Sequence, residues 1–414
     1  MEVIVERCAA LDVHKDTVMA CVRRPGTGTR RVQEVREFRT WTSSLRELRG
    51  WLAAEGVTQV AMEATGVYWR PVWAELEALE TVEMLLVNAQ HVKNLPGRKT
   101  DVNDACWLAQ LLECGLLRGS FVPPPVIARL RDLTRYRKKL VEDRVREVQR
   151  VQKLLETAGI KLDSVVSDVM GKAARRMLDA LIAGEQDPAV MAEMALTRMR
   201  PKIGELRLAL EGRFDDHHAL MLSLHLGHID QLTVTIDRLD AEVVREIDPF
   251  VEQVTHLRTI PGIGQRTAEV VIAEIGVDMT RFPTAAHLAS WAGLCPGNHE
   301  SAGKRRSGKA RKGDAALRVA LCEAAWSAAR TKDTYLAAQF RRFSRRMGKR
   351  NEGKAIFAVA HTMIVICWHV LANNVDYDEL GADYFDRRDT TAETRRHVAA
   401  LQRLGHTVTL DTAA

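Results

Sequence analysis

Four acidic residues stand at positions where a folded chain can bring side chains together. They are Asp12, Glu63, Asp101 and Asp104. The first two end short apolar runs at 8–13 and 58–62, and the last two open an expected helix, three residues apart and therefore on one side of it. Clustered carboxylates repel one another and resist desolvation, so such a set requires a divalent cation.

All-oxygen ligands favour Mg²⁺, with Mn²⁺ as an alternative, over zinc. Two such ions about 4 Å apart would stabilise the attacking and leaving oxygens of a phosphoryl transfer. Each acid also has a structural interpretation. Asp12 can cap a hairpin, and Asp104 can be a first-turn acid favoured by the helix dipole. The set of four, in this order of elements, favours a metal site.

A glycine-rich turn at 259–268 has the pattern of a helix-hairpin-helix motif. Its sequence places Gly262 and Gly264 just before a helix start. Backbone N–H groups at such a start, together with the helix dipole, suit a DNA phosphate without reading a base. A plain turn between two helices is the alternative.

A candidate nucleophile follows this turn. Ser301 lies between glycines, beside His299, Glu300 and Lys304. A serine nucleophile needs a group that accepts its proton and cations that hold the phosphate it attacks. Ser307 is an equally plain candidate on local grounds.

Basic residues gather in two runs although the net charge is only +6 and the pI about 9.0. Residues 304–312 hold six basic residues and no acid, and 341–354 hold seven and one acid. The alternative to a polyanion-binding surface is a solvated basic face. The residues expected to contact nucleic acid are Lys304, Arg305, Arg306, Lys309, Arg311, Lys312, Arg341, Arg342, Arg345 and Arg346.

Composition excludes several protein classes. With 414 residues, 46% hydrophobic and 28% charged, the chain has an ordinary globular composition and a length typical of two to three domains, which excludes wholesale disorder and low-complexity architectures. The longest apolar stretch, 355–372, is interrupted by His361, Thr362 and His369, so no membrane span is expected. The N-terminus lacks a signal pattern, and seven scattered cysteines without a C-x-x-C pair indicate reduced thiols. We therefore expect a cytoplasmic protein, associated with the nucleoid when active, without a zinc ribbon.

Patterning predicts an α/β region followed by an all-α body. Residues 1–122 read as three strands, helix, strand, helix, strand and helix. The expected strands are 8–13, 17–22, 31–39 (weak), 58–62 and 82–87, and the expected helices are 44–54 capped by Ser43 or Ser44, one from Pro71 to 79, and 101–113 capped by Thr100. A Pro96-Gly97 loop precedes the last helix.

Three prolines at 123–125 mark a linker to a helical middle, 123–254. A helix over 126–156 has its apolar residues at three- and four-residue spacing, which predicts a coiled coil or a helical hairpin, used for dimerisation or as a spacer. These residues are Leu130, Leu133, Tyr136, Leu140 and Val141. A second helical stretch, 203–247, is broken near 215–218, and a helical domain, 255–373, precedes a polar tail, 374–414.

Several segments together resemble transposases of the IS110 family, the IS110/IS1111-type insertion-sequence recombinases. The resemblance covers about 7–122 and 255–373. The matching segments are Leu-Asp-Val-His-Lys at 11–15, Met-Glu-Ala-Thr-Gly-Val-Tyr at 62–68, Lys-Thr-Asp-Val-Asn-Asp-Ala at 99–105, Ile-Pro-Gly-Ile-Gly at 260–264, Ala-Gly-Leu-Cys-Pro at 292–296 and Glu-Ser at 300–301.

The resemblance implies a RuvC-like N-terminal domain, an RNase H fold whose Asp12, Glu63, Asp101 and Asp104 bind Mg²⁺. It implies that Ser301 forms a covalent phosphoserine link to DNA at element ends and target. Several family members are guided by an RNA that the element encodes. They act as dimers pairing into tetramers, in which domains of different subunits meet at one site.

The leading hypothesis is a transposase or DNA recombinase that uses Ser301 and carboxylate-bound Mg²⁺. The first rival is a metal-dependent junction nuclease in which water attacks, and a covalent protein–DNA adduct separates the two. The second rival is a non-enzymatic DNA-binding scaffold, for which changing Glu63 alters nothing.

Overall fold

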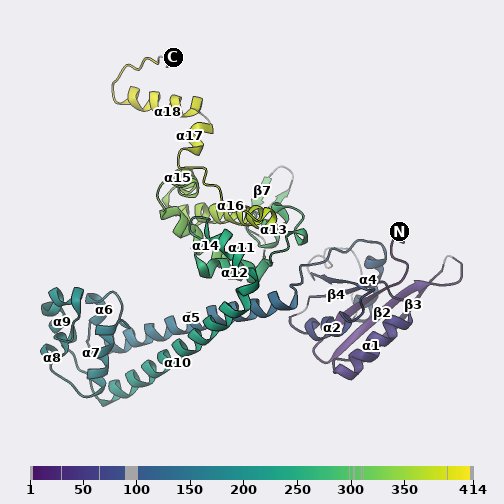
Figure 1. Ribbon diagram of the computed structural model, residues 1–414, viewed down its shortest axis with the longest axis horizontal. Coiled ribbons are helices and arrows are strands. Elements are labelled where there is room, and N and C mark those ends of the chain that lie inside the picture. Colours follow the sequence, from purple (N-terminus) through teal and green to yellow (C-terminus); the bar gives the residue numbers. More distant parts are fainter. Residues whose placement is uncertain are drawn as a thin grey trace. The chain divides into compact units, whose positions relative to one another are not determined.

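The structure is a computed structural model (Figure 1). It describes residues 3–410 except 29, 65, 89–100, 298, 302–303, 309, 311 and 389, and it does not describe the side chains of 101–103, 299–301, 304–307, 390–393 and 396. The chain divides into two compact units, Met1–Val122 and Pro123–Ala414.

The first unit is built on a five-stranded mixed sheet with the strand order β3-β2-β1-β4-β5. Its strands are β1 (Cys8–Val13), β2 (Thr17–Pro25), β3 (Arg31–Arg39), β4 (Gln59–Glu63) and β5 (Glu83–Val87). The first three pair antiparallel, whereas β4 runs parallel to both β1 and β5. The predicted mixed α/β region is therefore confirmed, and the weakly patterned third strand is a full nine-residue strand.

Helices cover both faces of this sheet. Side chains alternate between faces along a strand, so Leu11 packs in a core with α1 (Thr42–Ala54) and α2 (Trp69–Leu76), and Ala10 packs in a second core with α4 (Asp101–Glu113). The predicted bounds of α4 are confirmed.

Two details at helix ends differ from the sequence prediction. Trp41 precedes α1 without a side-chain cap, and the Ser44 hydroxyl instead accepts a bond from the Arg39 N–H at 3.1 Å, so the predicted serine cap is wrong. Helix α2 ends at Leu76, because residues 77–79 form a turn in which the Leu79 N–H binds the Leu76 carbonyl. The expected Thr100 cap and the Pro96-Gly97 loop lie outside the described residues.

The second unit begins with a long helical hairpin. Helices α5 (Pro125–Thr157) and α10 (Asp216–Ile247) run antiparallel, as residue pairs along their length show: Arg129 with Glu246, Arg137 with Asp240 and Arg144 with Thr233. Leu130 and Leu140 are buried as predicted, but Tyr136 is 55% exposed. The turn predicted near 215–218 is the N-terminus of α10, capped by Asp215.

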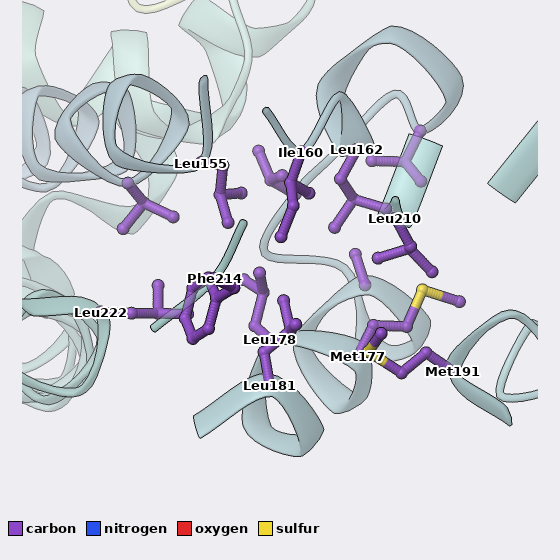
Figure 2. Packing of buried hydrophobic residues seen from close by; sticks show 14 of the residues in the cluster. Leu155, Ile160, Leu162, Met177, Leu178, Leu181, Met191, Leu210, Phe214 and Leu222 are labelled. Carbon is purple, nitrogen blue, oxygen red and sulfur yellow. The ribbon is translucent and has the colours of Figure 1, made fainter. Parts of the chain in front are cut away.

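Short helices form a compact end to this hairpin. They are α6 (Leu162–Val165), α7 (Lys172–Ile182), α8 (Pro188–Ala192) and α9 (Ile203–Leu210), with the 3-10 helix η1 (Thr197–Lys202) between the last two. Figure 2 shows their packing, in which Met177, Leu178 and Leu210 meet Leu155 of α5 and Leu222 of α10. This large apolar core gives the helical middle a packed subregion that the sequence did not indicate.

The remaining helices enclose an alanine-rich core. They are α11 (Val251–Arg258), α12 (Gln265–Ile275), α13 (Ala285–Trp291), α14 (Ala315–Arg330), α15 (Tyr335–Met347) and α16 (Glu352–Asn373), with short 3-10 turns η2 (Asp248–Phe250), η3 (Met279–Arg281) and η4 (Lys349–Asn351). The sequence predicted that this region is all helical, but it also contains two short strands. Strands β6 (His299–Ser301) and β7 (Lys304–Ser307) pair antiparallel as a two-stranded sheet. Helices α17 (Tyr384–Arg388) and α18 (Thr390–Arg403) follow in the tail.

Helix α16 lies in a segment, Lys349–Asn373, that has the length and mean hydropathy (2.0) of a membrane span. Half of that segment's most apolar window is buried within the fold. Core helices share these properties, and residues such as Val359, Met363 and Cys367 are fully buried against the other helices.

Candidate active site

Asp12 and Glu63 lie side by side at one edge of the sheet. Strands β1 and β4 pair in parallel with Leu11 opposite Met62, so the next residue on each strand is one of the two acids. Neighbouring strands are about 4.8 Å apart. The carboxyl ends of two adjacent parallel strands therefore carry an acid each, at matching positions.

Both carboxylates belong to the sheet face that α4 covers. Ala10 and Ala61, two residues earlier on the two strands, pack in the core with Ala105 and Leu108 of α4. Because side chains two residues apart share a face, Asp12 and Glu63 point to the same side. The Asp12 side chain is 16% exposed, which leaves it partly open to solvent at the sheet edge.

Helix α4 runs antiparallel to β1, and its first turn therefore lies at the same edge. Its C-terminal end is next to the start of β1, where the Ile4 and Val5 N–H groups bond the Glu113 carbonyl. Cys8 contacts the Ala109 carbonyl at 3.6 Å. Asp101 is eight residues before Ala109, about 12 Å along the helix axis. Asp12 is four residues after Cys8, about 13 Å along the strand. Measured from the Cys8–Ala109 contact, the two acids therefore lie at nearly the same height.

The far end of α4 is fixed by a buried ion-pair cluster. The Glu113 carboxylate is 4% exposed and accepts bonds from Arg23 at 2.9 Å and Arg31 at 2.6 Å, on β2 and β3. These contacts set the axial position of the helix on the sheet. They thereby set the height at which the first turn, with Asp101 and Asp104, meets the strand ends.

His14 is a neighbour of the site that the sequence analysis did not select. Its Nε2 atom lies 3.2 Å from Asp12 Oδ2, and the imidazole is 53% exposed. The signal for it in the sequence was its position two residues after Asp12. Side chains two residues apart on a strand point to the same face, so His14 was placed near the Asp12 side chain.

The oxygen donors at this edge fit a hard divalent cation better than zinc. Two carboxylates occupy matching strand ends, and the half-buried Asp104 lies in the first turn of α4 without forming a three-residue metal-binding group with them. Among the described side chains, no group of three His, Cys, Asp or Glu residues is close enough to hold a metal ion, and the Asp101 side chain is outside that set.

Two cysteines, Cys8 and Cys21, lie in the core between the sheet and α4. Burial raises the pKa of Cys8 to about 12 and also raises the pKa of Cys21. All seven cysteines are free thiols, as the sequence predicted.

The glycine turn joins α11 to α12, and its two glycines have different surroundings. Gly262 has φ +89°, and a Cβ there would lie 2.4 Å from the Ala324 carbonyl oxygen of α14, so this glycine permits close packing of the turn on a helix. Gly264 precedes α12 with open space around its Cα. Of the two, Gly264 is the one open to an approaching phosphate.

Ser301 is the last residue of β6 and is paired with Lys304 across the two-stranded sheet. Ser301 was predicted to lie in a glycine-flanked loop, and the structure corrects this to the end of a strand. Between this strand pair and α14, Gly313 packs closely on Gly293. A Cβ at Gly313 would lie 2.3 Å from the Gly293 nitrogen, so only glycine fits there. Ser307 is paired with His299 at the opposite end of the ribbon.

The expected basic contacts fall into two groups. The side chains of Lys304, Arg305, Arg306, Lys309 and Arg311 lie outside the described residues, and Lys312 is exposed. The arginines at 341, 342, 345 and 346 lie exposed on α15. The acidic edge belongs to the first unit, whereas the serine ribbon and both basic groups belong to the second.

Two family models match this chain. Residues 9–160 match the DEDD-type transposase model of IS110, and residues 254–341 match the model described as the transposase IS116/IS110/IS902 family. The first match contains all four acids, and the second contains the glycine turn, Ser301 and Arg341.

Curated relatives point the same way. A protein of insertion element IS110 from Streptomyces coelicolor is 60% identical over 40 residues, 10% of each chain. A pilin gene-inverting protein of Moraxella bovis is 26% identical over 197 residues, covering 42% of this chain and 60% of the relative. A protein of insertion element IS116 from Streptomyces clavuligerus is 26% identical over 286 residues, 60% of this chain and 68% of the relative. The chain thus spans from a tenth to about two thirds of the length of these relatives.

Proposed function

Because the chain belongs to the IS110 family of transposases, we propose that it cuts and rejoins DNA strands through attack of Ser301 on a DNA phosphate. Asp12, Glu63, Asp101 and Asp104 assist as ligands of Mg²⁺, or of Mn²⁺ in its place. The observation that carries the proposal is the register of β1 and β4, which sets two acids side by side at the edge where α4 begins.

The first unit supports an RNase H-like, RuvC-like assignment. A mixed sheet in the order β3-β2-β1-β4-β5, with acids at the ends of the two central strands and at the start of α4, is the arrangement that the assignment requires. When bound, the metal supplies positive charge that stabilises the developing charge on phosphate oxygens. The chain's part is to hold the acids at one edge, and the Glu113 ion pairs serve that purpose.

In the proposed step the Ser301 hydroxyl gives up its proton and its Oγ bonds to the phosphorus of the cleaved strand, while the bond from that phosphorus to the 3′- or 5′-oxygen breaks. The leaving oxygen takes up a proton, so there is no net loss of a proton. One phosphodiester replaces another, which keeps its energy for rejoining. Reacting atoms must come within about 3–3.5 Å. Lys304, the backbone partner of Ser301 across the two strands, is the cation that we propose balances charge on that phosphate. The ribbon and the basic run at 304–312 thus form the DNA side of the site, with Gly264 as a further backbone contact.

The acids and the serine lie in different units of the chain, about 200 residues apart. We therefore propose a homodimer assembling to a tetramer, in which one subunit's acids work with a partner's serine. Strand exchange by such an assembly accounts for both insertion and inversion, the latter being what the Moraxella relative is named for. An RNA encoded by the element, pairing with element ends and target, is the proposed source of sequence choice.

Trapping the covalent intermediate tests this function. The purified protein, end-labelled element DNA and Mg²⁺ are quenched with detergent and digested, and the labelled peptide is sequenced by mass spectrometry. We expect the label on Ser301, at wild-type yield in Ser307→Ala and absent in Ser301→Ala. Strand cleavage without any adduct would favour the water-using nuclease, and an adduct on Ser307 would transfer the role to that residue.

A further inference from the structure

Seven exposed cations form a surface at the end of α15 and the start of α16, which we call the α15 stripe. They are Arg341, Arg342, Arg345, Arg346, Lys349, Arg350 and Lys354. None of them makes an ion pair with any residue that the structure describes.

The cations of α5 show the opposite behaviour. Eight of its ten cations contact a carboxylate within 4.0 Å, so their charge is balanced inside the protein, whereas Arg144 binds Thr233 and Lys153 makes no ion pair with a described residue. The eight are Arg129, Arg131, Arg135, Arg137, Lys138, Lys139, Arg146 and Arg150. Single cations without an ion pair also occur elsewhere among the described residues, such as Arg238 and Arg318, and the α15 stripe differs from them in gathering seven within residues 341–354.

Stability of the helices alone does not account for the stripe. Like charges four residues apart, as in Arg341 with Arg345 and Arg342 with Arg346, destabilise a helix. The dipole at the C-terminus of α15 favours cations in its last turn, but Lys354 lies in the first turn of α16, where the dipole disfavours a cation. An external anion removes both costs.

Cation–π contacts orient two of the guanidinium groups without neutralising them. The Arg342 guanidinium lies 5.0 Å from the ring centre of Phe385 in α17, and that of Arg346 lies 5.2 Å from Phe343. The Phe385 ring is in turn stacked on Tyr335 at 5.2 Å. Phe385 and Tyr335 contact each other and Phe343 is covered by Arg346, so the stripe offers a ligand mainly charge.

We propose that the α15 stripe binds the phosphate backbone of DNA at a place separate from the serine ribbon, without reading sequence. The proposal rests on the proposed function, which supplies DNA as the polyanion. The four arginines span about 7.5 Å of helix, a length over which a DNA duplex carries about four negative charges. An anionic lipid surface is the weaker fit, since membrane-binding helices add exposed apolar side chains and the described residues of 335–354 expose no large one.

Salt titration of DNA binding tests the stripe. Full-length wild type, the double variant R341Q/R345Q and the matched control K139Q/R146Q are titrated with two unrelated labelled duplexes between 50 and 200 mM salt. The control removes the same charge from exposed residues of α5. Each lost phosphate contact reduces the magnitude of the slope of log K against log salt by about 0.9.

We expect R341Q/R345Q to reduce the magnitude of that slope by about 1.8, equally for both duplexes. Between about 50 and 200 mM salt, the affinity of the variant for DNA should therefore fall about tenfold less than the affinity of wild type does. We expect the control to match wild type. An unchanged slope overturns the proposal, as does a loss confined to one duplex, which would mean base reading. Selective loss of binding to phosphatidylserine vesicles would assign the stripe to lipid.

Failure of the proposed function is distinguishable from failure of the stripe. Ser301→Ala should retain the wild-type salt slope because it lies outside the stripe. If R341Q/R345Q shows the expected change in slope but wild type forms no adduct, DNA binding by the stripe is supported and the serine mechanism is wrong. If adducts form normally and the slope is unaffected, the stripe alone fails.

Discussion

At the residue scale, the proposed chemistry depends on four carboxylates, two of which stand next to each other at the sheet edge. Asp12 and Glu63 lie at matching strand ends. Neither belongs to the apolar cores on the two faces of the sheet, so replacing either one removes no core side chain. The strand patterns and the acids could be predicted from sequence, since alternation and chain order are local properties. His14 could not, because its importance lies in a 3.2 Å contact that only the folded strand end creates.

We predict that Asp12→Ala or Glu63→Ala abolishes recombination while the fold survives. Removing one carboxylate relieves repulsion in the metal-free protein. The thermal midpoint in chelator should therefore stay the same or rise, and the protection that Mg²⁺ gives to wild type should disappear. A thermal scan with and without Mg²⁺ measures both, and unfolding of either variant would assign the acids a structural role.

At the scale of elements, buried charges hold the helices that position the site. Chain periodicity predicted α4 and α5, but not which carboxylates fix them, because their partners lie about 90 and 140 residues away. The β6–β7 ribbon was missed for a different reason: its basic residues lack the apolar alternation by which a strand is recognised.

Glu113→Ala should destabilise the first unit by about 3 kcal/mol, the low end for a buried pair, because it leaves Arg23 and Arg31, whose side chains are 14% and 19% exposed, without their carboxylate. Urea unfolding followed by tryptophan fluorescence measures the change, with the exposed Glu80→Ala as the control that should move it by less than about 0.5 kcal/mol. Equal midpoints for the two variants would show that the ion pairs do not fix α4.

The α5–α10 hairpin should lose stability in acid through Glu147. Although burial opposes the charged form, bonds from His225 and Arg150 hold the pKa of this buried carboxyl below its usual value. A lowered folded pKa means that the stabilisation is present above the unfolded value of 4.5 and is lost as pH falls through the folded pKa. Between pH 7 and pH 3, wild type should therefore lose more stability than Glu147→Gln, and parallel losses would contradict this.

At the scale of the whole molecule, the acids and the serine belong to separate units joined through a long helical hairpin. The division near the triple proline was visible in the sequence as a change of composition, whereas the packed end of the hairpin was not, since its short helices have irregular spacing. Mixing an Asp12→Ala subunit with a Ser301→Ala subunit should restore part of the recombination that each lacks. A mixture as inactive as its parts would exclude assembly of the site between subunits.

The most direct test of the central claim, that the carboxylate edge and Ser301 act as one site, is the yield of the protein–DNA adduct in Glu63→Gln. This change removes a charge and keeps the side chain's size. The account predicts an adduct on Ser301 in wild type with Mg²⁺, none in wild type with chelator, and a loss of at least about a hundredfold in Glu63→Gln with Mg²⁺. An adduct formed at the wild-type rate by Glu63→Gln would contradict it.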